Sequence, residues 1–77
     1  MEIKQNAFGD YLISKNGVHK GYTLKILGVY KVFNKKGRIG FILKRDDEYI
    51  SYDNMGNAIE RGEFEKILLN FFKQKKG

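Results

Sequence analysis

"VYKVFNKKGRIGFILKR", residues 29–45, is the stretch that decides the fold class. Two runs rich in β-branched and aromatic residues flank the segment 34–37, which ends in Gly37. Glycine adopts a left-handed backbone conformation without steric cost, so this segment between two apolar runs predicts a β-hairpin. Six of the seventeen residues are Lys or Arg, and the predicted hairpin is therefore strongly basic.

The first strand of this hairpin is predicted to run from Tyr22 to Phe33, with a bend at Gly28. Alternation along the strand assigns one set of side chains to the core: Tyr22, Leu24, Ile26, Tyr30 and Val32. The other set mixes Lys with apolar residues and is expected to point outward: Thr23, Lys25, Leu27, Val29, Lys31 and Phe33. In the partner strand, 38–45, Ile39, Phe41 and Leu43 are expected to point inward. The alternate residues of this strand are expected to face outward: Arg38, Gly40, Ile42 and Lys44.

Turn signals divide the rest of the chain. Asn16-Gly17 is the strongest of them, because both residue types tolerate the positive φ angles of a tight hairpin turn, and it predicts a hairpin within residues 10–22. Residues 1–9 fit either a short strand or a turn of helix. After the basic hairpin the sequence predicts a turn at 46–48, a strand at 49–53, a turn at 54–57 and a last short strand at Ala58 and Ile59.

The hydrophobic period changes near the C-terminus. One helical stripe is formed by Phe64, Ile67, Leu68, Phe71 and Phe72. Acidic residues near its start and lysines at its end match the polarity of the helix dipole. The sequence therefore predicts a helix at about 61–74.

These elements predict one small domain, residues 1–77, of the mainly β (α+β) class, with its strands within 10–59. The strands form an antiparallel β-meander, which is either an SH3-like or OB-like barrel or an open sheet, with the C-terminal helix packed on it. A chain of this length buries only about 60% of its unfolded surface, so the aromatic stripe of the helix is needed to complete the core.

The composition argues against catalysis and against a bound cofactor or metal. The chain has no Cys and one His, so thiol chemistry, histidine triads and zinc sites lack their ligands. The acidic residues Asp46, Asp47 and Glu48 are consecutive and suit a polar turn rather than a paired-carboxylate site. No apolar stretch is long enough to cross a membrane, and the first residues do not have the order of a signal peptide, so we expect a cytoplasmic, non-enzymatic protein.

The charge indicates an anionic partner. Fifteen Lys and Arg residues against nine Asp and Glu residues give a net charge of +6, which attracts negatively charged molecules. Most of the candidate binding residues lie on or beside the basic hairpin: Lys25, Lys31, Phe33, Lys35, Lys36, Arg38 and Lys44. If outward side chains of paired strands are neighbours, Lys25, Lys31, Arg38 and Lys44 form one positive patch, which is interrupted by Leu27, Val29, Phe33 and Ile42.

Such a patch has three interpretations. Basic groups contact phosphates while aromatic groups stack on bases, so the first is nucleic-acid binding. The second is an inhibitor or adaptor that docks on an acidic surface of a host protein, of the kind that mobile elements and viruses encode. The third is purely structural: alternate lysines protect a sheet from edge-to-edge aggregation, or the helix covers the apolar residues between them.

The segment "YISYDNMGNAIERGEFEKILLNFFKQ", residues 49–74, has the order strand, Gly-containing turn and apolar-striped helix. In this order it resembles the end of the small SH3-like chromatin proteins of thermophilic archaea. The resemblance implies an SH3-like fold and binding of duplex DNA through a three-stranded sheet. The chain has no Trp, which such a DNA-facing sheet uses, and no residue role is transferred.

Overall fold

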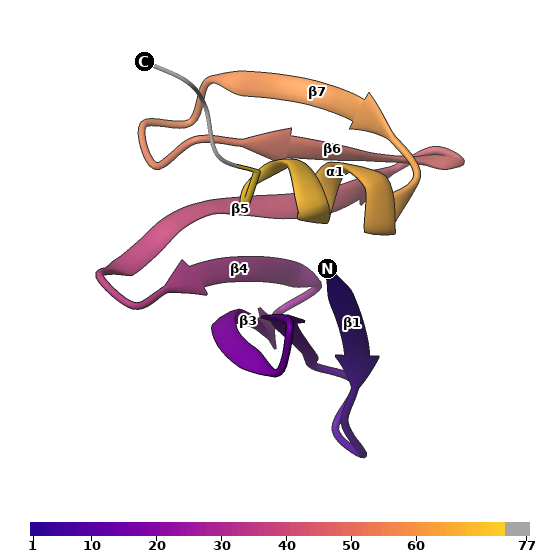
Figure 1. Ribbon diagram of the computed structural model, residues 1–77. Coiled ribbons are helices and arrows are strands. Elements are labelled where there is room, and N and C mark those ends of the chain that lie inside the picture. Colours follow the sequence, from indigo (N-terminus) through magenta and orange to yellow (C-terminus); the bar gives the residue numbers. More distant parts are fainter. Residues whose placement is uncertain (74–77) are drawn as a thin grey trace.

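The computed structural model describes residues 1–73 and shows seven strands followed by one short helix (Figure 1). Every strand pairs antiparallel with its neighbour in sequence, so the sheet order is β1-β2-β3-β4-β5-β6-β7. The strands are β1 (Glu2–Gln5), β2 (Tyr11–Lys15), β3 (Val18–Ile26), β4 (Val29–Asn34), β5 (Gly37–Arg45), β6 (Glu48–Tyr52) and β7 (Ala58–Gly62). The helix, α1, spans Phe64–Asn70.

The sheet curls into a half-barrel, and α1 lies across its concave side (Figure 1). The predicted antiparallel meander with a packed C-terminal helix is confirmed, in a form between a closed barrel and a flat sheet, since the edge strands β1 and β7 are not paired with each other. The strands extend beyond the predicted range at both ends, because β1 precedes residue 10 and β7 continues to Gly62. The helix is shorter than predicted, and residue 74 lies outside the described part of the chain.

The glycines that were predicted to adopt left-handed conformations do so. Asn16 and Gly17 have φ angles of 54° and 78° and form the two-residue turn between β2 and β3. Gly37 has a φ of 132° and begins β5 directly after the two-residue turn Lys35-Lys36. Both predicted hairpins are therefore present.

Residues 22–33 form two strands, whereas the sequence predicted one strand with a bend. The chain reverses at Leu27 and Gly28, whose φ angles are 52° and 81°. Positive φ at both central residues is characteristic of a type I′ turn, whose twist matches that of the paired strands. The pair Leu-Gly is a weak sequence signal for this turn, because leucine is strained in a left-handed conformation.

This extra turn corrects the predicted core face. Cross-strand partners share a face, and Ile26 is the partner of Val29, so the alternation of inward and outward residues shifts by one across the turn. Tyr22, Leu24 and Ile26, which were predicted to be core residues, therefore lie on the convex face, away from α1. The buried residue of this part of β3 is Thr23, whose hydroxyl accepts a hydrogen bond from the backbone N–H of Tyr11 at 3.0 Å.

The faces of β5 are corrected because its register with β4 shifts at a bulge between Val32 and Phe33. Val32 pairs with Gly40 and Tyr30 pairs with Ile42, so the concave side of β5 carries Gly40 and Ile42. Ile42, which was predicted to face outward, is fully buried. Phe41 and Leu43 face the convex side, whereas Ile39, which has no register partner at the bulge, packs against the core as predicted.

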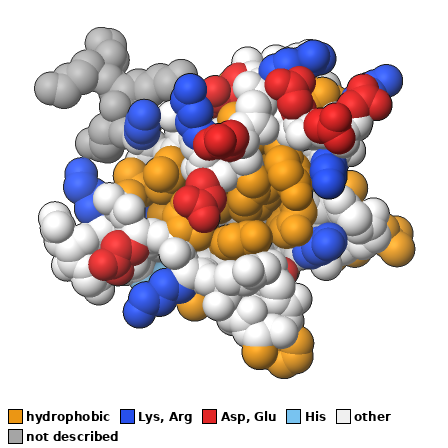
Figure 2. Space-filling view, turned by 90° about the vertical axis from the view of Figure 1, so that its right-hand side faces the viewer, with side chains coloured by type: hydrophobic (Ala, Val, Ile, Leu, Met, Phe, Trp, Pro, Cys, Tyr) orange, Lys and Arg blue, Asp and Glu red, His pale blue; other side chains and the backbone are white. Residues whose placement is uncertain are grey.

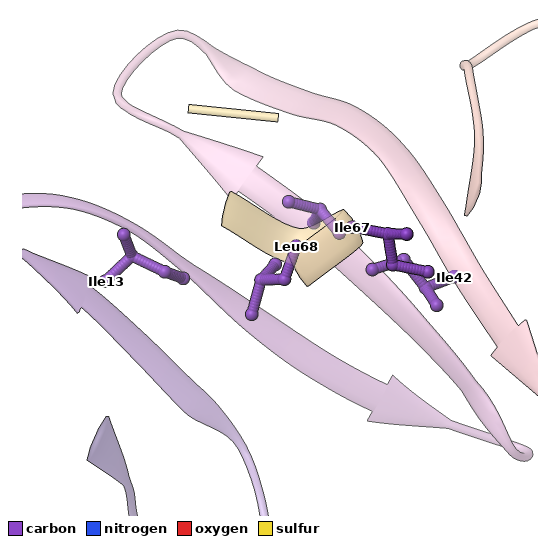
Figure 3. Packing of buried hydrophobic residues seen from close by; sticks show 5 residues of the cluster. Ile13, Ile42, Ile67 and Leu68 are labelled. Atoms are coloured by element: carbon purple, nitrogen blue, oxygen red, sulfur yellow. The ribbon is translucent and has the colours of Figure 1, made fainter. Parts of the chain in front are cut away.

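The core lies between the concave side of the sheet and α1. Its fully buried cluster consists of Ile13, Val32, Ile42, Ile67 and Leu68, from three strands and the helix (Figure 3). The predicted helical stripe is confirmed, because Ile67 and Leu68 are buried and the remaining three members, Phe64, Phe71 and Phe72, pack against the cluster.

The helix reaches both ends of the half-barrel through its aromatic residues. Near its start, the Phe64 ring lies 4.7 Å from the rings of Tyr11 and Tyr30 and 5.1 Å from that of Tyr49, measured between centroids. After its last turn, Phe71 and Phe72 cover the opposite end. No helix within residues 1–73 has the length and apolar character needed to cross a bilayer.

Two strand glycines make the close approach of these last rings possible. A Cβ atom on Gly21 would collide with the Phe72 ring and with the backbone carbonyl of Phe33. A Cβ atom on Gly40 would come within 2.6 Å of the Phe71 ring and would also meet the carbonyl of Tyr52. The lack of a side chain at these two glycines therefore lets the aromatic rings pack against the sheet, and neither glycine has a positive φ angle.

Candidate functional site

The convex face of the sheet is unusually rich in apolar side chains. Its central side chains stand in three cross-strand rows, of which the first continues to Lys4 on β1 and the third to Arg61 on β7: Leu12, Tyr22 and Phe33; Leu24, Lys31, Phe41 and Tyr52; and Ile26, Val29, Leu43 and Ile50. We refer to these eleven residues as the convex face. Its position opposite α1 leaves it uncovered by any described part of the chain (Figure 1).

Aromatic pairs occupy the half of the convex face nearest the β4–β5 turn. The rings of Tyr22 and Phe33 stack with centroids 5.0 Å apart and planes 9° from parallel. Phe41 and Tyr52 form a second stack at 5.2 Å and 14°. His19 extends the first pair, with its ring 6.3 Å from that of Tyr22 and nearly parallel to it. Four aromatic rings, in two ordered pairs, are thus presented on one surface.

The other half of the convex face is aliphatic. Ile26 is 45% exposed and Leu24 is 38% exposed, although both are apolar. Ile50, in contrast, is only 7% exposed while belonging to the side away from the helix, so neighbouring convex side chains cover it. A continuous apolar surface of this kind on a small domain is typical of a binding site rather than of an ordinary solvent-facing sheet.

Lys31 stands within this apolar surface. It pairs with Leu24 on one side and with Phe41 on the other, so its charged group emerges between the aromatic and aliphatic halves. Within residues 1–73, the ion pairs at 4.0 Å or less comprise only Arg61–Glu48, at 3.6 Å, which leaves Lys31 without a carboxylate partner in that part of the chain. The ammonium group is therefore free to meet an anion.

Arg38 lies at the border of the convex face, as the cross-strand partner of Phe33. Its Nε donates a hydrogen bond to Oδ1 of Asn54 at 2.9 Å, and Nδ2 of Asn54 donates one to the Arg38 carbonyl at 2.6 Å. These two bonds join the β5 strand to the β6–β7 turn. They hold Nε of the guanidinium group in place, while Nη1 and Nη2 remain available to a ligand.

The structure divides the predicted site residues into three groups. Lys31, Phe33 and Arg38 come together on or beside the convex face, as predicted. Lys35 and Lys36 form the adjoining β4–β5 turn. Lys25 and Lys44 fall on the other side of the sheet, because their register partners are Tyr30 and Tyr49, whose rings contact Phe64 of the helix.

Lys25 and Lys44 cap the tyrosine cluster instead of extending the convex face. The Nζ atom of Lys25 lies 5.3 Å from the centre of the Tyr30 ring, and that of Lys44 lies 6.0 Å from the centre of the Tyr49 ring, both within the range of cation–π attraction. The end of the molecule that faces the viewer in Figure 2 has hydrophobic side chains at its centre with acidic and basic groups around them. Its mixed charge makes it a weaker candidate for an anion site.

Two aromatic members of the convex face, Tyr22 and Phe41, were not predicted from the sequence. Phe41 was assigned to the inward side of its strand because the bulge between Val32 and Phe33 was not recognised, and Tyr22 was assigned to the core because the turn at Leu27-Gly28 was not recognised. The available signal was the glycine itself, since a Gly in the middle of a twelve-residue β-prone run fits a hairpin as well as a bend.

The described residues contain no cluster suited to metal binding. No three His, Asp or Glu side chains converge within residues 1–73. The carboxylate of Asp53 accepts hydrogen bonds from the backbone N–H groups of Asn57 and Met55, each at 2.9 Å, which lowers the pKa of Asp53 below its usual value. Burial raises the pKa of the Tyr11 phenol, with the nearby Tyr30 and Tyr49 adding to the effect. Asp53 thus holds a turn, and Tyr11 packs in the core.

Comparison of the chain with models of known families, with curated proteins and with solved structures gave no significant match. The convex face is therefore interpreted from its own chemistry.

Proposed function

We propose that this protein is a small non-enzymatic module that binds nucleic acid through the convex face. The observation that carries the proposal is the presence of two stacked aromatic pairs and an unpaired Lys31 on one uncovered sheet surface. Aromatic rings provide stacking surfaces for bases, worth about 1–3 kcal/mol per base, and Lys and Arg neutralise phosphates. A cytoplasmic location forms part of the same proposal.

The shape of the surface favours a single strand. A duplex is itself a convex rod, and its stacked bases expose only their edges, so a convex aromatic sheet can touch little of it. The splayed bases of a single strand can instead lie against Tyr22, Phe33 and their neighbours, while the backbone passes Lys31 and Arg38. Stacking of this kind tolerates many sequences, because every base has a flat face.

A second candidate function is docking on an acidic surface of another protein, as an inhibitor or adaptor. The aliphatic half of the convex face favours it, because Leu24, Ile26 and Leu43 offer no stacking surface but suit the apolar centre of a protein interface. Lys31 would then meet a carboxylate of the partner rather than a phosphate. The two functions differ in whether binding depends on the aromatic pairs and in how strongly binding weakens as the salt concentration rises.

The test compares two charge reversals on neighbouring strands, Lys31→Glu and Lys44→Glu. Both change the net charge equally, but Lys31 belongs to the convex face and Lys44 lies over Tyr49 on the other side. In fluorescence anisotropy with labelled single-stranded oligonucleotides at low salt, we expect Lys31→Glu to weaken binding by at least ~10-fold, about 1.4 kcal/mol, and Lys44→Glu by clearly less. The wild-type affinity should fall with salt with a log–log slope of about −3 for four phosphates.

Equal losses for the two variants would mean that net charge, and not the convex face, governs binding. If the wild type binds neither single-stranded nor double-stranded oligonucleotides at any salt concentration, the nucleic-acid function is wrong, and the acidic protein partner becomes the favoured candidate. Circular dichroism of both variants verifies that the sheet is intact before affinities are compared.

A further inference from the structure

A groove at the end of the half-barrel that holds the β2–β3 and β4–β5 turns concentrates positive charge. We propose that this groove binds consecutive phosphate groups of a polyanion, which, if the proposed function holds, is the backbone of the strand bound on the convex face. Five lysines line it: Lys15, Lys20, Lys35, Lys36 and Lys73. We call it the lysine groove.

The lysines converge from three separate parts of the chain. Lys15 and Lys20 flank the β2–β3 turn, Lys35 and Lys36 form the β4–β5 turn, and Lys73 follows α1. Antiparallel pairing of β3 with β4 matches Gly21 with Asn34, which brings the two turns to the same end of the sheet. The groove is thus a product of the fold, and only Lys35 and Lys36 were selected from the sequence.

The walls of the groove are held in place. The type I′ turn at Asn16-Gly17 keeps Lys15 opposite Val18. In the other turn, the backbone N–H of Lys36 donates a hydrogen bond of 2.8 Å to Oδ1 of Asn34, which also lines the groove. A fixed backbone with flexible lysine side chains suits phosphate groups, because each ammonium group can donate from several directions.

The floor of the groove is apolar. It is formed by Phe71 and Phe72, the two rings that Gly40 and Gly21 admit to the sheet. The five lysines around this floor are exposed to solvent, so the attraction for an anion comes from their number and their convergence rather than from the exclusion of water.

The cations of the groove lack internal compensation. No Asp or Glu lines it, and none of the five lysines forms an ion pair of 4.0 Å or less within residues 1–73. Like charges that are held close together repel each other, so their convergence opposes folding unless an anion neutralises them. A chain of phosphates, with one negative charge each, can neutralise several ammonium groups at once.

The groove adjoins the aromatic half of the convex face. Asn34 of the groove follows Phe33 of the Tyr22–Phe33 stack, and Arg38 comes two residues after Lys36. A strand whose bases stack on these rings reaches the groove by passing around the β4–β5 turn, because the rings of Phe71 and Phe72 lie on the concave side of the sheet. This continuity distinguishes the groove from the opposite, mixed-charge end of the molecule.

The test uses two double variants with the same loss of charge. Lys35→Gln/Lys36→Gln removes two cations from the groove, and Arg45→Gln/Lys66→Gln removes two exposed cations elsewhere. Each lost phosphate contact should reduce the salt slope of single-strand binding by about 0.7, so we expect a loss of about 1.4 for the groove variant and little change for the control. Equal changes in the two variants would overturn the proposal.

A second arm separates the groove from the nucleic-acid function. Inorganic tripolyphosphate is added to the ¹⁵N-labelled wild type, and the backbone amide signals are followed by NMR. We expect the signals of residues 15–20 and 34–36 to shift, and those shifts to be lost in the Lys35→Gln/Lys36→Gln variant. If these signals shift but no oligonucleotide binds, the lysine groove is a phosphate site and the proposed nucleic-acid function is wrong. If tripolyphosphate leaves them unchanged, the lysine groove is not a phosphate site.

Discussion

At the scale of single residues, Gly21 and Gly40 determine how closely the C-terminal rings approach the sheet. Each faces α1 in the interior of a strand, where a larger residue would ordinarily pack better. The sequence showed both glycines but not their partners, because Phe72 is fifty-one positions from Gly21 and only the fold brings them together. Long-range contacts of this kind have no local signal.

This packing predicts a coupling between Gly21 and Phe72. Gly21→Ala places a methyl group against the ring and the Phe33 carbonyl, and such overpacking costs about 1–3 kcal/mol of unfolding free energy. In the Phe72→Ala background the ring is gone, so the same change should cost less by at least about 0.5 kcal/mol. Urea denaturation of the four proteins in this double-mutant cycle measures the coupling. An identical cost in both backgrounds would show that the ring does not lie over Gly21.

At the scale of elements, the helix and those turns that depend only on neighbouring residues were predicted correctly. The helical stripe from Phe64 onward and the Asn16-Gly17 hairpin follow from neighbouring residues, and both are present. The turn at Leu27-Gly28 was missed because its first residue is a poor turn former. One unrecognised turn was enough to move Tyr22 to the wrong face, since inward and outward positions alternate along a strand.

The strained turn gives a prediction of its own. Leu27 is 98% exposed and has a φ of 52°, a conformation that costs about 1–2 kcal/mol for residues with a Cβ atom. Asparagine tolerates this conformation and forms the preferred Asn-Gly turn, so Leu27→Asn should raise the unfolding free energy by about 0.5–1 kcal/mol. The urea midpoint should rise with an unchanged slope, while Leu27→Val should lower it. If Leu27→Asn instead lowers the unfolding free energy, the Leu27 side chain makes a stabilising contact that is absent from this structure.

At the scale of the whole molecule, the half-barrel has a covered side and an uncovered side. The helix covers the apolar residues of the concave side, whereas the convex face remains uncovered, with aliphatic and aromatic side chains around Lys31. The alternation of residues 29–34 predicted the outward position of Lys31 and Phe33, whereas Arg38 borders this face because of the bulge between Val32 and Phe33. The alternation could not separate them from Lys25 and Lys44, since the facing of those two lysines depends on the register of the complete sheet.

The central claim, that the convex face is the binding surface, is tested most directly by mapping the contact. The ¹⁵N-labelled protein is titrated with a short single-stranded oligonucleotide at low salt, and the shift of each backbone amide signal is measured by NMR. The account predicts that the largest shifts occur at Lys31, Phe33, Phe41 and Tyr52, while the amides of Glu65 and Lys66, on the helix, remain unchanged. Largest shifts on the helix or around Tyr11 and Phe64, or no shift at any position, would contradict it.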